Sequence, residues 1–118
     1  MTVCLALARC GEHRRAAALA DEIRRVADPR ELTEEVAATY GLCMAAVQGD
    51  KAPEQLGPEG RKLRDRYRDL ALETAREGIR KGYRGSIFLE GDPDYEPIRA
   101  VPEYAQLLAE IKQAARPR

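Results

Sequence analysis

The sequence predicts an all-α protein made of antiparallel helix pairs, and three observations lead to that prediction. Apolar residues recur at three- and four-residue spacings over most of the chain, as in helices with one buried face. Glycine and proline separate these amphipathic stretches. No run of five or more residues shows the alternating, β-branched pattern of a half-buried strand. With 118 residues, the chain is long enough for one helical domain, residues 1–118, with its own core.

The first two helices are expected at residues 3–10 and 13–26, with a turn at Gly11 between them. The second helix carries its apolar residues on one face and most of its arginines on the other. Asp28 and Pro29 end this helix, because proline cannot continue the hydrogen-bond ladder. The same two residues begin the next helix, since aspartate is a good N-cap and proline suits the first helical position.

The third helix, residues 29–48, is apolar on most sides beyond its first turn, which predicts a central position between neighbouring helices. Residues 49–60 hold two prolines and three glycines and are expected to form a loop. The fourth helix is expected at residues 61–81. Its acidic residues recur every four positions, which predicts ion pairs within the helix, such as Glu73 with Arg76.

The last third of the chain is expected to close the helical array. Gly82 is the predicted C-cap of the fourth helix, and a short helix is expected at residues 86–90. Pro93 and Pro97 oppose a regular helix in the turn that follows. A final amphipathic helix is predicted to begin near Pro102.

Composition and charge argue against several classes of function. The 20 basic and 20 acidic residues cancel, which argues against binding of nucleic acid or of a membrane surface by the chain as a whole. No apolar run approaches the ~20 residues that cross a bilayer, and no secretory signal is evident, so we expect a cytoplasmic protein. Cys4, Cys10 and Cys43 are expected to be small buried thiols, because their odd number and spacing suit neither disulfides nor a zinc site.

We expect no catalytic residues, no metal site and no cofactor in this chain. His13 is the single histidine, and we interpret it as a solvated residue, because a general base needs an orienting partner and a nearby nucleophile. Asp92 and Asp94 alternate as carboxylates in a Ca²⁺ loop do. The rest of the twelve-residue loop pattern is missing, and helix capping is the better interpretation of these residues.

Two parts of the chain resemble successive tetratricopeptide repeats (TPRs). The matching positions are Gly11, Ala16, Ala20, Ile23 and Asp28-Pro29 in the first unit, and Ala71, Ala75 and Gly78 in the next. Ala16 and Ala71 are 55 residues apart rather than the 34 of a regular TPR, which implies an insertion of about 21 residues. The resemblance implies helix pairs in a right-handed superhelical stack, divided into a partial repeat (1–28), an insertion-bearing repeat (29–82) and a short helix with a capping helix (83–115).

A narrower resemblance covers nearly the whole chain. The segments VAATYGLCMAAVQGD, LALETAREGIRKGY and FLEGDPDYEPIRAVPEYAQLLAEI are similar to the TPR tails that follow planctomycete-type bacterial serine/threonine protein kinase domains. The matching residues are Gly82-Tyr83, Asp92-Pro93-Asp94, Pro97-Ile98-Arg99, Pro102 and Leu107-Leu108. The chain has no glycine-rich loop, His-Arg-Asp or Asp-Phe-Gly motif of its own. The resemblance therefore implies the C-terminal end of a longer array, with any catalysis in a parent protein.

The TPR resemblance also implies a groove lined by the first helix of each pair. Carried onto residues 29–48, the groove residues are Leu32, Glu35, Thr39, Leu42 and Cys43. Some TPR domains clamp a partner's C-terminal carboxylate with lysine, asparagine and arginine. Because Glu35 and Thr39 cannot supply that positive charge, we expect no such clamp here. An apolar groove suits a helical segment of a partner, or an upstream repeat of the same chain.

The start of the fourth helix is predicted to present a basic surface that includes Arg61, Arg64 and Arg68. The aromatic residues needed to stack on single-stranded nucleic acid are absent, so an acidic protein partner is favoured. We therefore expect a non-catalytic protein–protein interaction module that binds a protein or peptide. The alternative is a self-association module, in which the first helix pair forms a homodimer through an apolar face. A nucleic-acid binder or a small enzyme is the third interpretation.

Overall fold

The computed structural model describes residues 3–26, 29–49, 51–80 and 96–115. Within these residues it contains six α-helices, one 3₁₀-helix and no strand, which confirms the all-α prediction. The elements are α1 (Val3–Arg9), α2 (His13–Val26), α3 (Pro29–Gln48), η1 (Pro53–Gln55), α4 (Pro58–Arg80), α6 (Glu96–Arg99) and α7 (Tyr104–Ala115). None of the described helices is long and apolar enough to cross a membrane.

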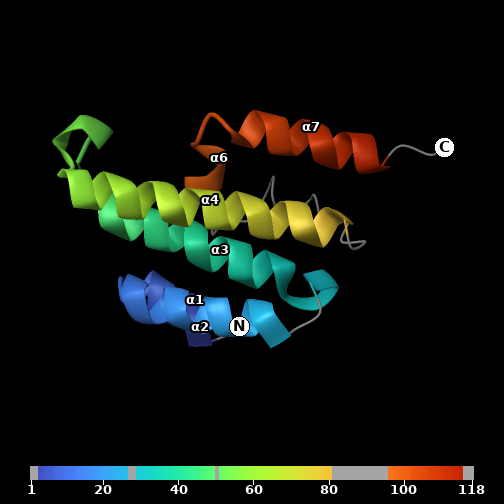
Figure 1. The fold of residues 1–118 in the computed structure, drawn as a ribbon, viewed down its shortest axis with the longest axis horizontal. Helices are drawn as coiled ribbons and strands as arrows, with labels where there is room; N and C mark the ends of the chain where they lie inside the picture. Colours follow the sequence, from blue (N-terminus) through green and yellow to red (C-terminus); the bar gives the residue numbers. More distant parts are fainter. Residues whose placement is uncertain (1–2, 27–28, 50, 81–95, 116–118) are drawn as a thin grey trace.

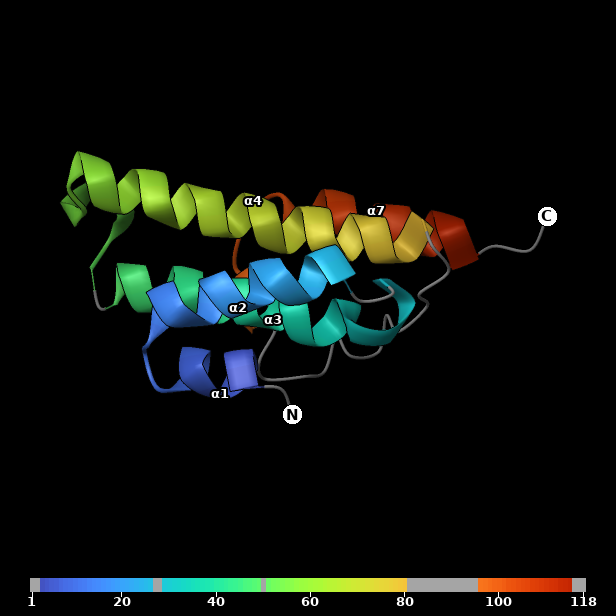
Figure 2. The same ribbon diagram turned by 60° about the horizontal axis from the view of Figure 1, so that its bottom comes forward.

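The helices form three layers around α3. Figure 1 shows α1 and α2 on one side, α3 and α4 in the middle, and α6 and α7 on the other side. The turned view in Figure 2 shows α4 and α7 side by side, with α1 on the far side of α2 and α3. Because α3 packs against α1, α2, α4 and α6, its predicted central position is confirmed.

The turn between α1 and α2 depends on Gly11. Its φ of 83° lies in the left-handed region, which glycine adopts without a Cβ penalty. The Gly11 amide donates to Ala8 O at 3.1 Å, and the Glu12 amide donates to Leu7 O at 2.9 Å. These two bonds satisfy carbonyls at the end of α1 and reverse the chain, as the sequence predicts for this glycine.

Small residues allow the helices to approach closely. The positions predicted for tight packing, Ala16, Ala20, Ala71 and Ala75, are all buried in one core cluster. Cys4 and Cys43 belong to the same cluster, whereas Cys10 is exposed. The prediction that all three thiols are buried is therefore wrong for Cys10, which follows the last residue of α1 in the turn.

Two element boundaries differ from the prediction. α4 begins at Pro58, three residues early, because proline is compatible with the first turn of a helix. α6 spans Glu96–Arg99, so Pro97 lies within a short helix rather than in an irregular turn, for the same reason. The predicted cap at Gly82, the helix at 86–90 and the caps at Asp92 and Asp94 lie outside the described residues.

α6 is attached to α3 through one close approach. Ile98 of α6 is fully buried, and a Cβ built on Gly41 of α3 would lie only 2.7 Å from Ile98 Cγ1. Glycine at position 41 therefore forms the notch that receives Ile98. Two ion pairs attach α7 and the residue before it to α4: Arg76 Nε lies 2.8 Å from Glu110 Oε2, and Arg68 Nη1 lies 3.8 Å from Glu103 Oε1.

We predict that Gly41→Ala destabilises the protein, because the new methyl group must displace Ile98. The matched control is Gly60→Ala in α4, where a Cβ would make an ordinary contact at 3.6 Å with Leu56. Both changes gain helix propensity, so their difference isolates the overpacking cost of about 1–3 kcal/mol. Urea unfolding of the two variants measures this difference. Equal stability of the two would contradict the assigned role of Gly41.

Candidate functional site

Two of the residues predicted to line a groove are in the core. Thr39 and Cys43 are fully buried, so neither is accessible to a partner in this arrangement. The Thr39 hydroxyl donates its single proton to Glu35 O at 2.7 Å, and the Cys4 thiol of α1 therefore donates to Thr39 Oγ1 at 3.4 Å. Cys43 Sγ donates to His13 O at 3.4 Å. These two residues form the contact of α3 with α1 and α2, which corrects their assignment to an open groove.

Burial also explains the chemistry of Cys43. Loss of solvation, with smaller contributions from Cys4 and Asp21, raises the pKa of the Cys43 thiol to about 12. The thiol is therefore protonated and unreactive at neutral pH. Glu35 is half-buried, and the side chain of Leu32 lies outside what the structure describes.

The structure brings Leu42 together with Arg64 and Arg68, which the sequence had placed in two separate predicted surfaces. They line one groove of about 560 Å³ between the C-terminal half of α3, the first half of α4 and the segment from α6 to the start of α7. We call it the α3–α7 groove. Its lining residues are Leu42, Met44, Ala45, Gln48, Gly49, Arg64, Arg68, Glu96, Pro97, Ala100, Val101, Pro102 and Glu103.

The floor of the α3–α7 groove is apolar. Met44 is buried, Leu42 and Val101 are half-buried, and Ala45 and Ala100 are exposed. Alanine and proline contribute little side-chain volume, which leaves space above the larger apolar residues. The groove can therefore accept an apolar side chain from outside.

The charged wall of the groove is already paired. Arg64 Nη2 lies 2.7 Å from Asp65 Oδ1, and Arg68 Nη1 lies 3.5 Å from the same oxygen. Arg68 Nε also donates to Asp69 Oδ1 at 3.1 Å. Burial lowers the pKa of Arg68, but the hydrogen bond to Asp69 and the charges of Asp65 and Glu103 raise this pKa by more. Arg68 therefore stays cationic at any pH the fold tolerates.

Arg61, the third residue of the predicted basic surface, has a different role. Its guanidinium donates to the backbone oxygens of Leu56 at 3.3 Å and Glu54 at 3.4 Å. These bonds tie η1 and the segment after it to the start of α4. The predicted surface of three arginines is therefore divided, because Arg61 contacts the loop while Arg64 and Arg68 line the groove.

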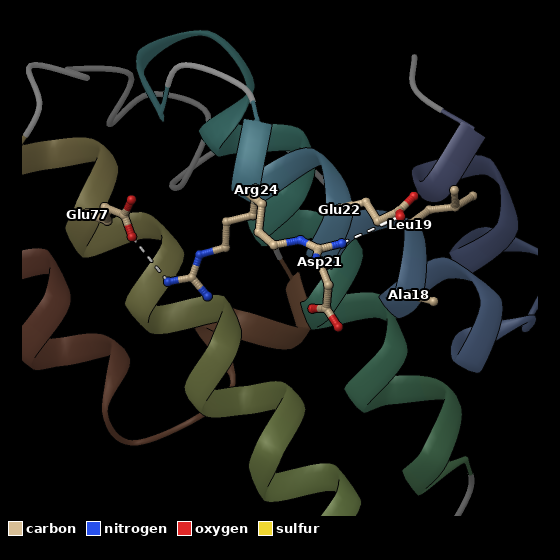
Figure 3. A pocket seen from close by; sticks show the side chains of 7 residues that line it. Ala18, Leu19, Asp21, Glu22, Arg24 and Glu77 are labelled. Carbon is tan, nitrogen blue, oxygen red and sulfur yellow. Dashed lines mark hydrogen bonds and ion pairs between the residues drawn. The ribbon is translucent and has the colours of Figure 1, made fainter.

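A second pocket, of about 850 Å³, lies beside α2 and α4 (Figure 3). Arg24 extends from α2 towards α4, where its Nη2 lies 3.3 Å from Glu77 Oε2, and Arg25 pairs with Glu22 at 3.5 Å. The lining is dominated by charges paired with one another. This pocket therefore serves the contact between α2 and α4 better than it would hold a ligand.

The pocket also borders a partly buried hydrogen bond. The hydroxyl of the fully buried Tyr40 donates to Asp21 Oδ1. Burial, together with this hydrogen bond and the Asp21 charge, raises the pKa of Tyr40 well above its ordinary value. Tyr40 therefore stays neutral and holds α2 against α3.

His13 is not simply solvated, which corrects its interpretation from the sequence. Its ring is half-buried, its Nδ1 lies 3.0 Å from the hydroxyl of buried Tyr67, and the two rings meet edge to face with centroids 5.7 Å apart. This contact connects the start of α2 to α4. Among the described residues, no group of three or more histidine, cysteine, aspartate or glutamate side chains is placed to hold a metal ion.

Comparison with known proteins adds no relative. No family model, no curated protein and no solved structure matches this chain. The function is therefore inferred from the geometry of the chain itself.

We predict that His13 makes the stability of the protein depend on pH. Burial, with a smaller contribution from Arg14, lowers the pKa of His13 below 6.5 in the folded state, so the unfolded chain binds a proton more readily. The contribution of His13 to the free energy of unfolding is therefore complete above pH 6.5, and it is lost as the pH falls through the folded-state pKa. His13→Gln removes this contribution.

Urea unfolding of the wild type and His13→Gln between pH 5 and 7.5 measures the effect. As the pH falls, the unfolding free energy of the wild type is expected to decrease more than that of His13→Gln. The carboxylates common to both proteins cancel in this comparison. A difference that stays constant across this range would show that His13 titrates alike in both states.

Proposed function

We propose that this chain is a non-catalytic protein-interaction module of TPR-like helix pairs, with the α3–α7 groove as its binding surface. The order of helix contacts supports this proposal. α1 packs on α2 and on α3, and α3 in turn packs on α4 and α6. In the first two pairs, the first helix therefore contacts its own partner and the first helix of the next pair. The buried alanines at the predicted packing positions agree with such a stack.

The observation that carries the proposal is the α3–α7 groove. Its volume of about 560 Å³ lies within the ~300–1,000 Å³ of ligand pockets, and its apolar floor is combined with a few charged groups. Its described lining combines two arginines with two glutamates, Glu96 and Glu103, and holds no cysteine, serine, threonine, histidine or lysine. A groove of this kind suits a short apolar segment of a protein partner.

The location of the module in a larger protein is part of the same proposal. The similarity of segments such as Gly82-Tyr83 and Asp92-Pro93-Asp94 to kinase tails supports a serine/threonine protein kinase as the parent. The reading frame upstream of Met1 tests this part. A kinase domain encoded there would support the proposal, and a frame without one would remove the kinase from it.

We predict that Ala45→Arg blocks the groove, because Ala45 is an exposed lining residue and a long charged side chain there occupies the apolar floor. Twelve-residue peptides selected from a displayed random library on the wild type are expected to bind Ala45→Arg about tenfold or more weakly, a loss of about 1.4 kcal/mol. The measurement is fluorescence anisotropy with the selected peptides.

The matched control is Ala18→Arg, an exposed alanine on α2 beside the second pocket. Circular dichroism and urea unfolding establish that both variants fold. If the selected peptides bind Ala45→Arg as tightly as the wild type, the α3–α7 groove is not the binding surface. Loss of binding only in Ala18→Arg would place the site at α2 and α4 instead.

Self-association is a second candidate function, favoured by the outer face of α1. This helix, VCLALAR, is apolar up to its last residue, yet Val3 is 68% exposed and Ala6 is also exposed. A helix that is apolar all round is normally covered on all sides. A second copy of the chain would cover this face and bury both residues.

The second candidate predicts a species of twice the 13.2 kDa chain mass in size-exclusion chromatography with light scattering. Ala6→Glu is expected to convert it to a monomer, because the buried carboxylates would repel across a two-fold interface. The measurement needs a reductant, since Cys10 is exposed and able to form an intermolecular disulfide. A monomer at all accessible concentrations would contradict self-association.

A further inference from the structure

The α3–α7 groove presents negative charge outward, although the sequence around it is rich in arginine. The side chains of Arg64 and Arg68 are only 19% and 25% exposed. Their carboxylate partners Asp65, Glu103 and Asp69 are 42%, 45% and 59% exposed. Of these carboxylates Glu103 lines the groove, so a ligand that approaches the groove meets the Glu103 carboxylate before it meets the guanidinium groups.

Exposure decides which charge an incoming ligand meets. The lining holds two arginines and two glutamates, while Asp65 and Asp69 pair with the arginines from outside the lining. The outward charge of the lining therefore belongs to Glu96, which is exposed, and to Glu103, which is 45% exposed. An acidic ligand would have to displace an existing ion pair and would be repelled by the remaining carboxylates.

The carboxylates keep the capacity to bind a cation. The ion pairs of Arg64 and Arg68 use one oxygen of each partner, namely Oδ1 of Asp65, Oδ1 of Asp69 and Oε1 of Glu103. A carboxylate accepts through both of its oxygens, with about four lone-pair positions in all. An incoming ammonium or guanidinium group can therefore be bound without breaking the pairs that hold the groove wall.

We infer, on the basis of the function proposed above, that the partner of the α3–α7 groove is a peptide segment with an apolar side chain flanked by lysine or arginine. The apolar side chain lies on the floor formed by Leu42, Ala45 and Val101. The flanking cation lies against Glu103 and Glu96 at the rim. This is the opposite of the acidic partner that the run of arginines predicts, because those arginines are neutralised from within the protein.

The composition of the selected peptides gives the first test. Peptides that bind the wild type but not Ala45→Arg depend on the groove, and they are expected to be enriched in lysine or arginine within two positions of an apolar residue. Their affinity is expected to fall as NaCl is raised from 50 to 300 mM, because exposed charge pairs are screened by salt.

A matched pair of variants gives the second test. Glu96→Gln/Glu103→Gln removes two carboxylates from the rim, and Glu22→Gln/Glu73→Gln removes two exposed carboxylates from α2 and α4 outside the groove lining, with the same change in net charge. Glu96→Gln/Glu103→Gln is expected to weaken the binding of groove-dependent peptides roughly fivefold, which corresponds to a loss of about 1 kcal/mol in binding free energy. The second is expected to change their affinity less than twofold.

The outcomes separate the inference from the function on which it depends. Groove-dependent peptides enriched in aspartate or glutamate, or bound more tightly by Glu96→Gln/Glu103→Gln, would overturn the basic partner and leave groove binding in place. The same holds for groove-dependent peptides without charge preference. If no selected peptide distinguishes the wild type from Ala45→Arg, the proposed function fails, and the inference fails with it.

Discussion

The rest of the structure depends on the packing of α3 against four other helices. Covering one helix on so many sides requires small residues at the closest contacts and polar groups whose hydrogen bonds are satisfied locally. Gly41 meets the first requirement where Ile98 approaches, and Ala37 and Cys43 are fully buried elsewhere on the helix. Thr39 meets the second requirement by donating to Glu35 O one turn earlier. The three layers therefore share one central element, and each is held by its contact with α3.

Local sequence information predicts the helices well and their partners poorly. The bounds of α2 and α3 match the expectation, because proline, glycine and the 3.6-residue period act within one segment. The ion pairs predicted within α4 match only in part, because Asp65 and Asp69 pair with Arg68 of the same helix but other charges do not pair within it. Arg76 was expected to pair within α4 but pairs with Glu110 of α7, and Glu77 pairs with Arg24 of α2. Four-residue spacing shows which charges share a helix face, but not which neighbouring helix that face contacts.

The candidate site shows the same division between local and tertiary information. Leu42, Arg64 and Arg68 were each predicted to be functional, but their meeting in one groove follows from the docking of α6 and α7, which no local pattern encodes. Thr39 and Cys43 were misplaced because α3 is apolar on nearly every side, so its hydrophobic pattern does not identify the face that α1 and α2 cover. An isolated glycine inside a helical pattern was the one available signal for the Gly41 contact.

The groove consists of segments that are distant in the chain, and this has a thermodynamic consequence. Its lining combines α3 and α4 with residues from Glu96 to Glu103, so the groove exists only while α6 and α7 are docked. A ligand in it must favour the docked state, and docking must favour the ligand by an equal free energy. The fit of Ile98 against Gly41 thereby becomes a determinant of affinity, although neither residue lies in the groove lining. The strength of the proposed binding is thus partly set at a helix contact that the ligand never reaches.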